Sequence, residues 1–208
     1  MDFLSKFVNW LSGVFLKKRK FSLGLYGQVN AGKTSLANRI SLDWLGEEVG
    51  KVSEIPHETR AVTKKEHVIV KAGGRTLEMN LLDMPGIATK IDYKDFLKYG
   101  IKKDAAQTRA KEATKGIIEA IKWLEKVDVA LVIMDATEDP LTQVNITILG
   151  NLEARKIPII LVANKIDDKK AKPEKIRDAF PQYSVVEISA LTGENVDKLY
   201  ESIAKNVG

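Results

Sequence analysis

Short apolar runs alternate with longer amphipathic stretches along most of the chain. The apolar runs have the length and composition of buried strands, and they lie at residues 21–26, 67–72, 77–82, 129–134, 157–163 and 184–188. The amphipathic stretches repeat apolar positions with a helical period, and they lie at residues 35–44, 102–126, 141–155, 173–180 and 195–206. Gly73 and Gly74 predict a tight hairpin between the second and third strands, whereas helices separate the later strands. The pattern predicts an α/β fold: a mostly parallel six-stranded sheet with one antiparallel edge hairpin and helices on both faces.

The segment 87–128 is long, charged and mostly helical in pattern. Its apolar positions between residues 102 and 126 predict a helix that lays one face on the sheet. These positions are Ala105, Ala106, Ala113, Ile117, Ile118, Ile121 and Leu124. The segment also contains the aromatic residues Tyr93, Phe96, Tyr99 and Trp123, which either pack within the domain or form a surface for a partner.

The first twenty residues form a separate amphipathic pattern. Large apolar side chains fall on one side of a helical wheel and polar ones mostly on the other, and the basic cluster 17–20 follows. The stretch is too short and too polar to span a bilayer, and no signal-peptide cleavage site follows it. We expect an anchor that lies at an anionic membrane surface, and the alternative is a helix packed on its own domain or on a partner protein. The chain thus divides into an anchor at 1–20 and a domain at 21–208.

The charge distribution supports this division. The chain of 208 residues has a net charge of +5, and +4 of it lies in the first twenty residues. The remainder is close to neutral, so its composition does not indicate a nucleic-acid-binding surface. The sequence has no cysteine, which excludes disulfides and thiolate metal sites.

The stretch 27–34 reads Gly-Gln-Val-Asn-Ala-Gly-Lys-Thr and lies between the first predicted strand and the first predicted helix. Gly27 and Gly32 allow the backbone to curl so that N–H groups point at anionic oxygens, and the helix N-terminus adds a partial positive charge. Lys33 has the length to reach the outer phosphates of a nucleotide, and the Thr34 hydroxyl is a ligand for Mg²⁺. The stretch matches the pattern G-x-x-x-x-G-K-[ST] at every defined position, and it lies between a strand and a helix as that pattern requires. We therefore predict a phosphate-binding loop rather than a plain glycine turn.

A second motif, Asp83-Met84-Pro85-Gly86, ends the third predicted strand. A carboxylate at this point can hold Mg²⁺ through water, and the bend at Pro85 turns the Gly86 N–H toward the terminal phosphate. The same four residues also suit an ordinary β-turn. Their place after a strand that follows a phosphate-binding loop favours the metal and phosphate roles.

A third motif, Asn164-Lys165-Ile166-Asp167, follows the fifth predicted strand, and Ser189-Ala190-Leu191 follows the sixth. The Asp167 carboxylate can accept two parallel hydrogen bonds from guanine, whereas adenine lacks that pair of donors. Asn164 would bind the base and brace the phosphate-binding loop, while the Lys165 stem would lie over the ring. The backbone N–H at Ser189-Ala190 would bind the guanine oxygen. The alternative is a surface turn.

Taken in order, these motifs resemble those of Era-like GTPases of the translation-factor class. The resemblance covers residues 21–208 and implies a Ras-like P-loop GTPase domain that binds Mg²⁺ and GTP and slowly hydrolyses GTP to GDP. It also implies two switch loops that respond to the nucleotide. By resemblance, Thr59 is the switch-one threonine that reaches Mg²⁺ in the GTP state, and Thr63 is the rival because the loop is long.

The resemblance assigns roles to named residues. The expected nucleotide-binding residues are Gly27, Asn30, Ala31, Gly32, Lys33, Thr34, Ser35, Asp83, Gly86, Asn164, Lys165, Asp167, Ser189, Ala190 and Leu191. The expected catalytic residues are Lys33, Thr59 and Gly86, and the expected Mg²⁺ ligands are Thr34, Thr59 and Asp83.

Two positions depart from or extend the pattern. Ras-like enzymes carry a water-orienting glutamine after the second motif, and this chain has Ile87, so another group must hold the water and turnover should be slow. Asn30 stands where potassium-activated relatives carry asparagine, and its amide oxygen could coordinate K⁺ beside the phosphates. The alternative is that Asn30 only caps or turns the loop.

We therefore expect a small GTPase switch in the cytoplasm, peripheral on the cytoplasmic face of the membrane. The segment 87–128 is the candidate surface for a protein effector or a nucleotide-dependent homodimer. One alternative is a nucleotide-stabilised membrane receptor or scaffold subunit with little hydrolysis. Another is an RNA- or ribosome-associated assembly GTPase, which is less favoured because the core is near neutral and no RNA-binding module is expected after the last helix.

Overall fold

The computed structural model describes residues 20–50, 52–53, 57–72, 75–88 and 91–207. The strands are β1 (Lys20–Gly27), β2 (Thr63–Ala72), β3 (Arg75–Asp83), β4 (Val129–Asp135), β5 (Ile159–Asn164) and β6 (Val185–Glu187). The helices are α2 (Lys33–Leu45), α3 (Tyr93–Leu97), α4 (Lys103–Trp123), α5 (Gln143–Ala154), α6 (Pro173–Ala179) and α7 (Val196–Val207). A short 3₁₀ turn, η1 (Leu124–Lys126), follows α4. The expected anchor at 1–20 lies outside the described residues except for Lys20.

The strands form one sheet in the order β2-β3-β1-β4-β5-β6. Strand β1 lies between β3 and β4 and runs parallel to both, whereas β2 pairs with β3 in the antiparallel sense at the edge. A short turn can join only antiparallel neighbours, and parallel neighbours need a crossover such as a helix. The predicted six-stranded sheet with one edge hairpin is confirmed.

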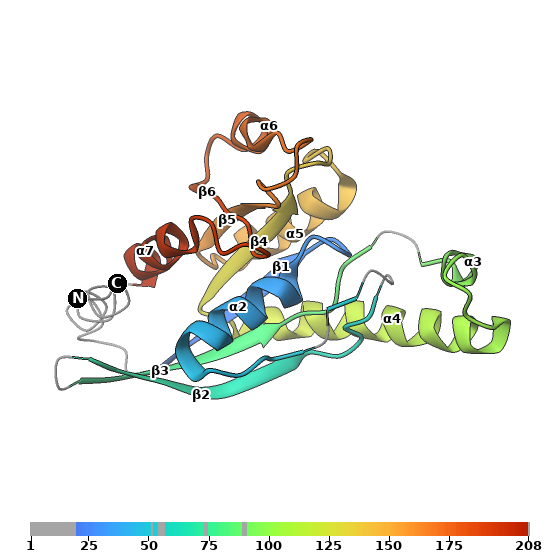
Figure 1. Ribbon diagram of the computed structural model, residues 1–208, viewed down its shortest axis with the longest axis horizontal. Helices are drawn as coiled ribbons and strands as arrows, with labels where there is room; N and C mark the ends of the chain where they lie inside the picture. Colours follow the sequence, from blue (N-terminus) through green and yellow to red (C-terminus); the bar gives the residue numbers. More distant parts are fainter. Residues whose placement is uncertain (1–19, 51, 54–56, 73–74, 89–90, 208) are drawn as a thin grey trace.

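Helices cover both faces of the sheet (Figure 1). Along β4, Val129, Leu131 and Ile133 belong to a core with α2 and α7, while Ala130, Val132 and Met134 belong to a core with α4, α5 and α6. Successive side chains of a strand point to opposite faces, so a continuous apolar strand can fill both cores. Motifs at the carboxyl ends of such strands therefore meet at one edge.

The long segment after β3 adds to the prediction and corrects part of it. It contains a short additional helix, α3, before the predicted one, and the chain turns between them at Lys98–Lys102, where Gly100 has a φ of +74°. The apolar face predicted for residues 102–126 is only partly right. Ala106, Ala113 and Leu124 are buried as predicted, together with Gly116 and Ala120, whereas Ile118 and Ile121 are 52% and 38% exposed. Small residues are needed on the inner face because the backbone of Arg60 passes close to it, and a Cβ on Gly116 would lie 2.4 Å from the Arg60 carbonyl oxygen.

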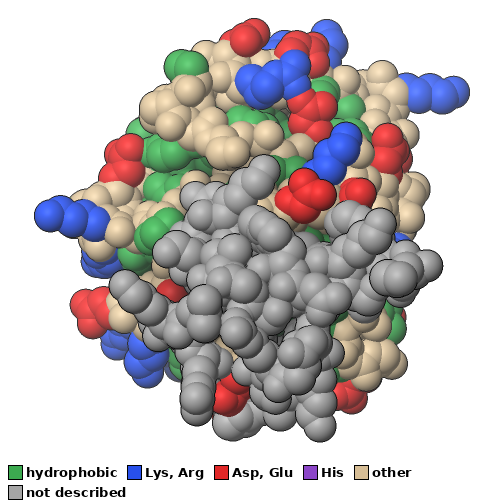
Figure 2. All heavy atoms as spheres, turned by 90° about the vertical axis from the view of Figure 1, so that its left-hand side faces the viewer, with side chains coloured by type: hydrophobic (Ala, Val, Ile, Leu, Met, Phe, Trp, Pro, Cys, Tyr) green, Lys and Arg blue, Asp and Glu red, His purple; other side chains and the backbone are tan. Residues whose placement is uncertain are grey.

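Strand β2 starts four residues earlier than the apolar pattern indicated, and Thr63 pairs with Asp83 at the end of β3. This pairing brings the preceding residues 57–62 close to the edge of the sheet at which β3 ends. No helix within the described ranges combines the length and apolar character that a bilayer crossing requires. On the face shown in Figure 2, basic and acidic side chains are interspersed over the coloured part of the surface.

Candidate functional site

The loop between β1 and α2 curls tightly enough to require glycine at two positions. Gly27 and Gly32 have φ values of +153° and +96°. A Cβ on Gly27 would lie 2.3 Å from the Ile133 carbonyl oxygen, and a Cβ on Gly32 would lie 2.1 Å from the Asn164 side-chain nitrogen. Conformation and lack of space thus act together, and the loop can approach its neighbours only without these side chains.

Lys33 lies inside this loop and is only 5% exposed. Its ammonium donates a hydrogen bond of 2.6 Å to the Gln28 carbonyl oxygen across the loop. Burial lowers the pKa of Lys33 to about 8, although the nearby Asp83 carboxylate opposes the shift. A buried ammonium whose hydrogen bond goes to a backbone carbonyl is well suited to bind anionic phosphate oxygens.

Three oxygen-bearing side chains from separate elements meet at the start of α2. The Thr34 hydroxyl donates to Asp83 Oδ2 at 2.7 Å and lies 3.0 Å from the Thr59 hydroxyl. Asp83 is buried, burial raises the pKa of its carboxyl group, and its Oδ1 makes no hydrogen bond to the described residues. Mg²⁺ prefers hydroxyl, carboxylate and water oxygens, so these residues fit the ion.

The structure also distinguishes the two switch-one candidates by position. Thr59 lies beside Thr34, whereas Thr63 lies in β2 opposite Asp83 and does not line the cavity described below. The chain therefore runs from Thr59, beside the expected Mg²⁺ ligand Thr34, to Thr63, the first residue of the edge strand β2.

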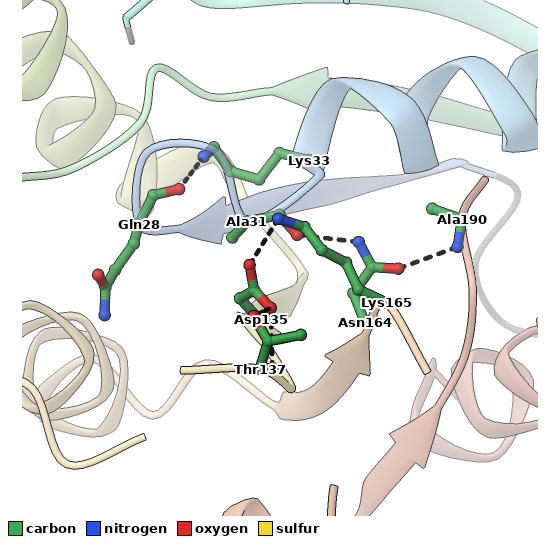
Figure 3. A network of polar contacts seen from close by, with 8 residues as sticks. All are labelled: Gln28, Ala31, Lys33, Asp135, Thr137, Asn164, Lys165 and Ala190. Carbon is green, nitrogen blue, oxygen red and sulfur yellow. Dashed lines mark hydrogen bonds and ion pairs between the residues drawn. The ribbon is translucent and has the colours of Figure 1, made fainter. Parts of the chain in front are cut away.

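Asn164, at the end of β5, joins the phosphate-binding loop to the loop after β6 (Figure 3). Its amide nitrogen donates to the Ala31 carbonyl oxygen at 2.9 Å, and its amide oxygen accepts from the Ala190 N–H at 2.9 Å. The Ala190 N–H expected to face a guanine oxygen is thus already engaged by Asn164, and the Ser189 N–H donates to the Glu194 carbonyl oxygen. In this geometry Asn164 links the two loops, and its role toward a bound base stays a prediction.

A cavity of about 590 Å³ extends between the phosphate-binding loop and the base-binding motif. The predicted site residues that line it are Asn30, Gly32, Lys33, Thr34, Ser35, Thr59, Gly86, Asn164, Lys165, Asp167, Ala190 and Leu191. The other predicted residues, Gly27, Ala31, Asp83 and Ser189, are buried and do not line the cavity. Lys33 and Asp167, which are distant in the sequence, therefore face a single cavity.

Sequence reasoning missed part of the cavity wall, chiefly Val52, Ser53, His57, Glu58 and Asp168. The signal available for His57 and Glu58 was their place just before Thr59 in a polar loop, but such a loop has no periodicity that indicates which side chains point inward. His57 is 8% exposed with a φ of +57°, and its ring centroid lies 6.1 Å from that of Phe96 in α3. Burial, and then the positive charge of Lys33, lower the pKa of His57.

The segment around Thr59 is attached to α4 by charge as well as packing. Arg109 lies 3.3 Å from Glu58, and Arg60 lies 2.6 Å from Glu112. The helix residues Arg109, Glu112 and Gly116 are spaced so that they share one side of α4. Helix α4 therefore supports the segment that presents Thr59.

A glycine-rich loop between a strand and a helix, a hydroxyl–carboxylate metal position and a base-recognition motif at the same sheet edge define a P-loop GTPase domain. The comparisons agree. The chain belongs to the family described as 50S ribosome-binding GTPase, whose family model matches residues 22–165.

The chain is 28% identical over 202 residues to the tRNA modification GTPase MnmE of Thermotoga petrophila. The matched region covers 96% of the chain and 38% of that protein. Among solved structures, it is similar to an Era variant from Aquifex aeolicus bound to GDP and AlF4⁻, with a TM-score of 0.69, 26% identity, and coverage of 92% of the chain and 58% of that structure. It is also similar to Era in complex with MgGDPNP and part of 16S ribosomal RNA, with a TM-score of 0.68, 25% identity, and coverage of 90% and 57%. The chain thus spans about two-fifths of that MnmE protein and less than two-thirds of the Era chains.

Proposed function

We propose that this chain is a GTP-dependent switch that binds Mg²⁺–GTP in the cavity and hydrolyses GTP slowly to GDP. The observation that carries the proposal is the contact of Thr34 with Asp83 and Thr59 beside a cavity that Asp167 also lines. Thr34 and Thr59 would hold Mg²⁺ directly and Asp83 through water, and the ion would neutralise charge on the phosphates. Lys33 and the Gly86 N–H would bind the outer phosphate oxygens.

Base selection would come from the loops after β5 and β6. Asp167 is exposed at the cavity rim, where its carboxylate can accept two hydrogen bonds from guanine. Asn164 would keep the two loops in register with the phosphate-binding loop. Leu191, which is 76% exposed, would cover the base from the opposite side to the Lys165 stem.

Slow turnover is supported by the position of Ile87. Its N–H donates to the Gly27 carbonyl oxygen at 3.2 Å, and its side chain packs against the core shared with α4 and α5. An aliphatic side chain held in this way cannot orient the attacking water by hydrogen bonding.

The test of this function is multiple-turnover GTP hydrolysis by the purified chain, with ATP as the competing substrate. We expect guanine-specific, Mg²⁺-dependent turnover that Lys33→Ala abolishes. ATP preferred over GTP, or equal activity in Lys33→Ala, would contradict the proposal. The rival function, a receptor or scaffold subunit, would instead show stoichiometric GTP that survives purification and no turnover.

We further propose that K⁺ stimulates the hydrolysis through Asn30. Asn30 has a φ of +62° and lines the cavity, which supports a role for its amide oxygen beside the phosphates. We expect faster turnover in KCl than in NaCl at matched ionic strength, and expect Asn30→Ala to remove the difference. Equal rates in the two salts would refute the role of K⁺.

We also propose that the chain acts at the cytoplasmic face of a membrane through residues 1–20, with the segment 87–128 as the surface for an effector or a second copy. The amphipathic and basic pattern of the first twenty residues supports the membrane contact. Exposed Leu97, Tyr99, Ile118 and Ile121 on α3, the following turn and α4 support the second part.

Ribosomal RNA is a second candidate partner. It is favoured by the family description and by the RNA in one of the similar Era structures. The near-neutral charge of residues 21–208 weighs against it, since phosphate contacts dominate nucleic-acid affinity. Binding to a ribosomal RNA fragment that weakens steeply with salt would support this partner, and no binding at low salt would exclude that fragment.

A further inference from the structure

Asp135, at the end of β4, occupies the position next to the base-binding motif on the neighbouring strand. The sheet register places Asp135 opposite Asn164, and Asp135 Oδ2 accepts a 2.5 Å hydrogen bond from the Lys165 ammonium. Its other oxygen, Oδ1, accepts from the Thr137 N–H at 2.9 Å and from the Thr137 hydroxyl at 2.7 Å. Both carboxylate oxygens are therefore engaged, and Figure 3 shows Thr137, Asp135 and Lys165 in one connected network.

The two ends of this network differ in exposure. The Asp135 side chain is 15% exposed and the Lys165 side chain 38% exposed. Burial alone would raise the pKa of Asp135, but the hydrogen bonds from Lys165 and Thr137 outweigh it and lower the pKa. The carboxylate is thus charged at neutral pH and held in one orientation before any nucleotide arrives.

Lys165 needs such a partner for two reasons. Its φ of +70° is a left-handed conformation that lysine rarely adopts, so the turn between Asn164 and Asp167 is constrained. Its four-carbon stem would otherwise sample many rotamers beside the cavity, and ordering it on binding would reduce affinity. An ion pair at the far end of the stem orders it in advance.

We propose that Asp135, oriented by Thr137, is a positioning residue that holds the Lys165 stem as a preformed platform for the guanine ring and thereby slows nucleotide release. This inference rests on the proposed role of Lys165 in the nucleotide site. The base and ribose are common to GDP and GTP, so the effect applies to both nucleotides equally.

The experiment is stopped-flow dissociation of fluorescent GDP and of a fluorescent non-hydrolysable GTP analogue from the full chain with Mg²⁺. We expect Asp135→Asn to raise the dissociation rate constant about 3- to 10-fold for both nucleotides, the range expected when one ordered side chain becomes mobile. Thr137→Val is expected to act in the same direction with a smaller effect. The matched control is Asp139→Asn, since Asp139 lies on the same loop, caps the Leu141 N–H at 3.0 Å and is outside the network.

A double-mutant cycle separates positioning from general structural damage. If Asp135 acts through Lys165, then Lys165→Met and the double variant should dissociate at similar rates, with no further effect of Asp135→Asn. The proposal would be overturned if Asp135→Asn raised the dissociation rate constant by the same factor with and without Lys165. It would also be overturned if Asp135→Asn changed that rate constant less than twofold, or if Asp139→Asn had an equal effect. A wild-type chain that binds no guanine nucleotide would overturn the proposed function itself.

Discussion

The Lys33 ammonium shows how burial at a single residue prepares the site for its ligand. Enclosed by the phosphate-binding loop, it loses hydration that only partners within the cavity can replace, and this loss lowers its pKa to about 8. Phosphate oxygens would supply the missing negative charge. Binding should therefore raise the pKa of Lys33 again.

This shift predicts proton uptake on nucleotide binding. Because the pKa is higher in the complex than in the free protein, affinity should be greatest below about pH 8 and fall as the pH rises above it. In the free protein the same group makes stability rise with pH between about 8 and its unfolded value of 10.5, since the unfolded state binds more protons there. Calorimetry of GDP binding at about pH 9, in two buffers of different ionisation enthalpy, measures the uptake.

Lys33→Gln is the control for that measurement, because it removes the titrating group while keeping a polar side chain. Residual binding by this variant should show no lysine-linked uptake. Identical binding enthalpies of the wild type in the two buffers would contradict the prediction.

The hydroxyl of Thr59 gives a second prediction at this scale. Thr59→Ala should slow GTP hydrolysis by about 10-fold or more while leaving GDP affinity nearly unchanged, because the ligand is needed for the triphosphate-bound state. Thr59→Ser should retain most of the activity, and Thr63→Ala should resemble the wild type. Single-turnover hydrolysis and GDP titration measure both quantities; a larger loss in Thr63→Ala than in Thr59→Ala would reverse the assignment.

Helix α4 is the element that supports the segment carrying Thr59. Two ion pairs join them, but both are partly exposed, and such pairs contribute only about 0–1 kcal/mol each. The close contact between Gly116 and the Arg60 backbone is the stronger constraint, since any side chain there must displace one of the two. The position of the segment that carries Thr59 is thus coupled to the packing of α4.

Two glycines within helices allow this coupling to be tested. Gly116→Ala should destabilise the domain by about 1–3 kcal/mol through overpacking and should slow GTP hydrolysis, because the segment carrying Thr59 is pushed away. Gly150→Ala in α5, where an added Cβ meets nothing within 4 Å, should stabilise by about 0.5–1 kcal/mol and leave hydrolysis unchanged. Urea denaturation and turnover assays measure the two effects, and a neutral Gly116→Ala would show that α4 does not constrain the segment.

At the scale of the whole molecule, the sheet gathers every motif at one edge while the excess charge belongs to the first twenty residues. That separation predicts that membrane contact and nucleotide binding are carried by different parts of the chain. A chain beginning at residue 20, where β1 starts, keeps all the strands and the cavity described here.

Liposome flotation tests the division directly. The full chain should float with vesicles that contain anionic lipid and should lose flotation when residues 1–19 are removed or when the salt concentration is high. The shortened chain should bind GDP as the full chain does, which is the control for folding. Equal flotation of the two chains would remove the anchor.

The sequence by itself determined the parts that depend on local chemistry: strand and helix order, the hairpin, and the motifs at the strand ends, because each needs only a short pattern and its immediate context. It could not identify the whole inner face of α4, since Gly116 there lies against the backbone of Arg60, a residue more than fifty positions away. For the same reason it missed His57 in the cavity and Asp135 behind Lys165. A loop has no periodicity, and an ion pair between two strand ends exists only after the sheet has set their register. Tertiary structure decided these contacts because they join residues whose proximity no local pattern encodes.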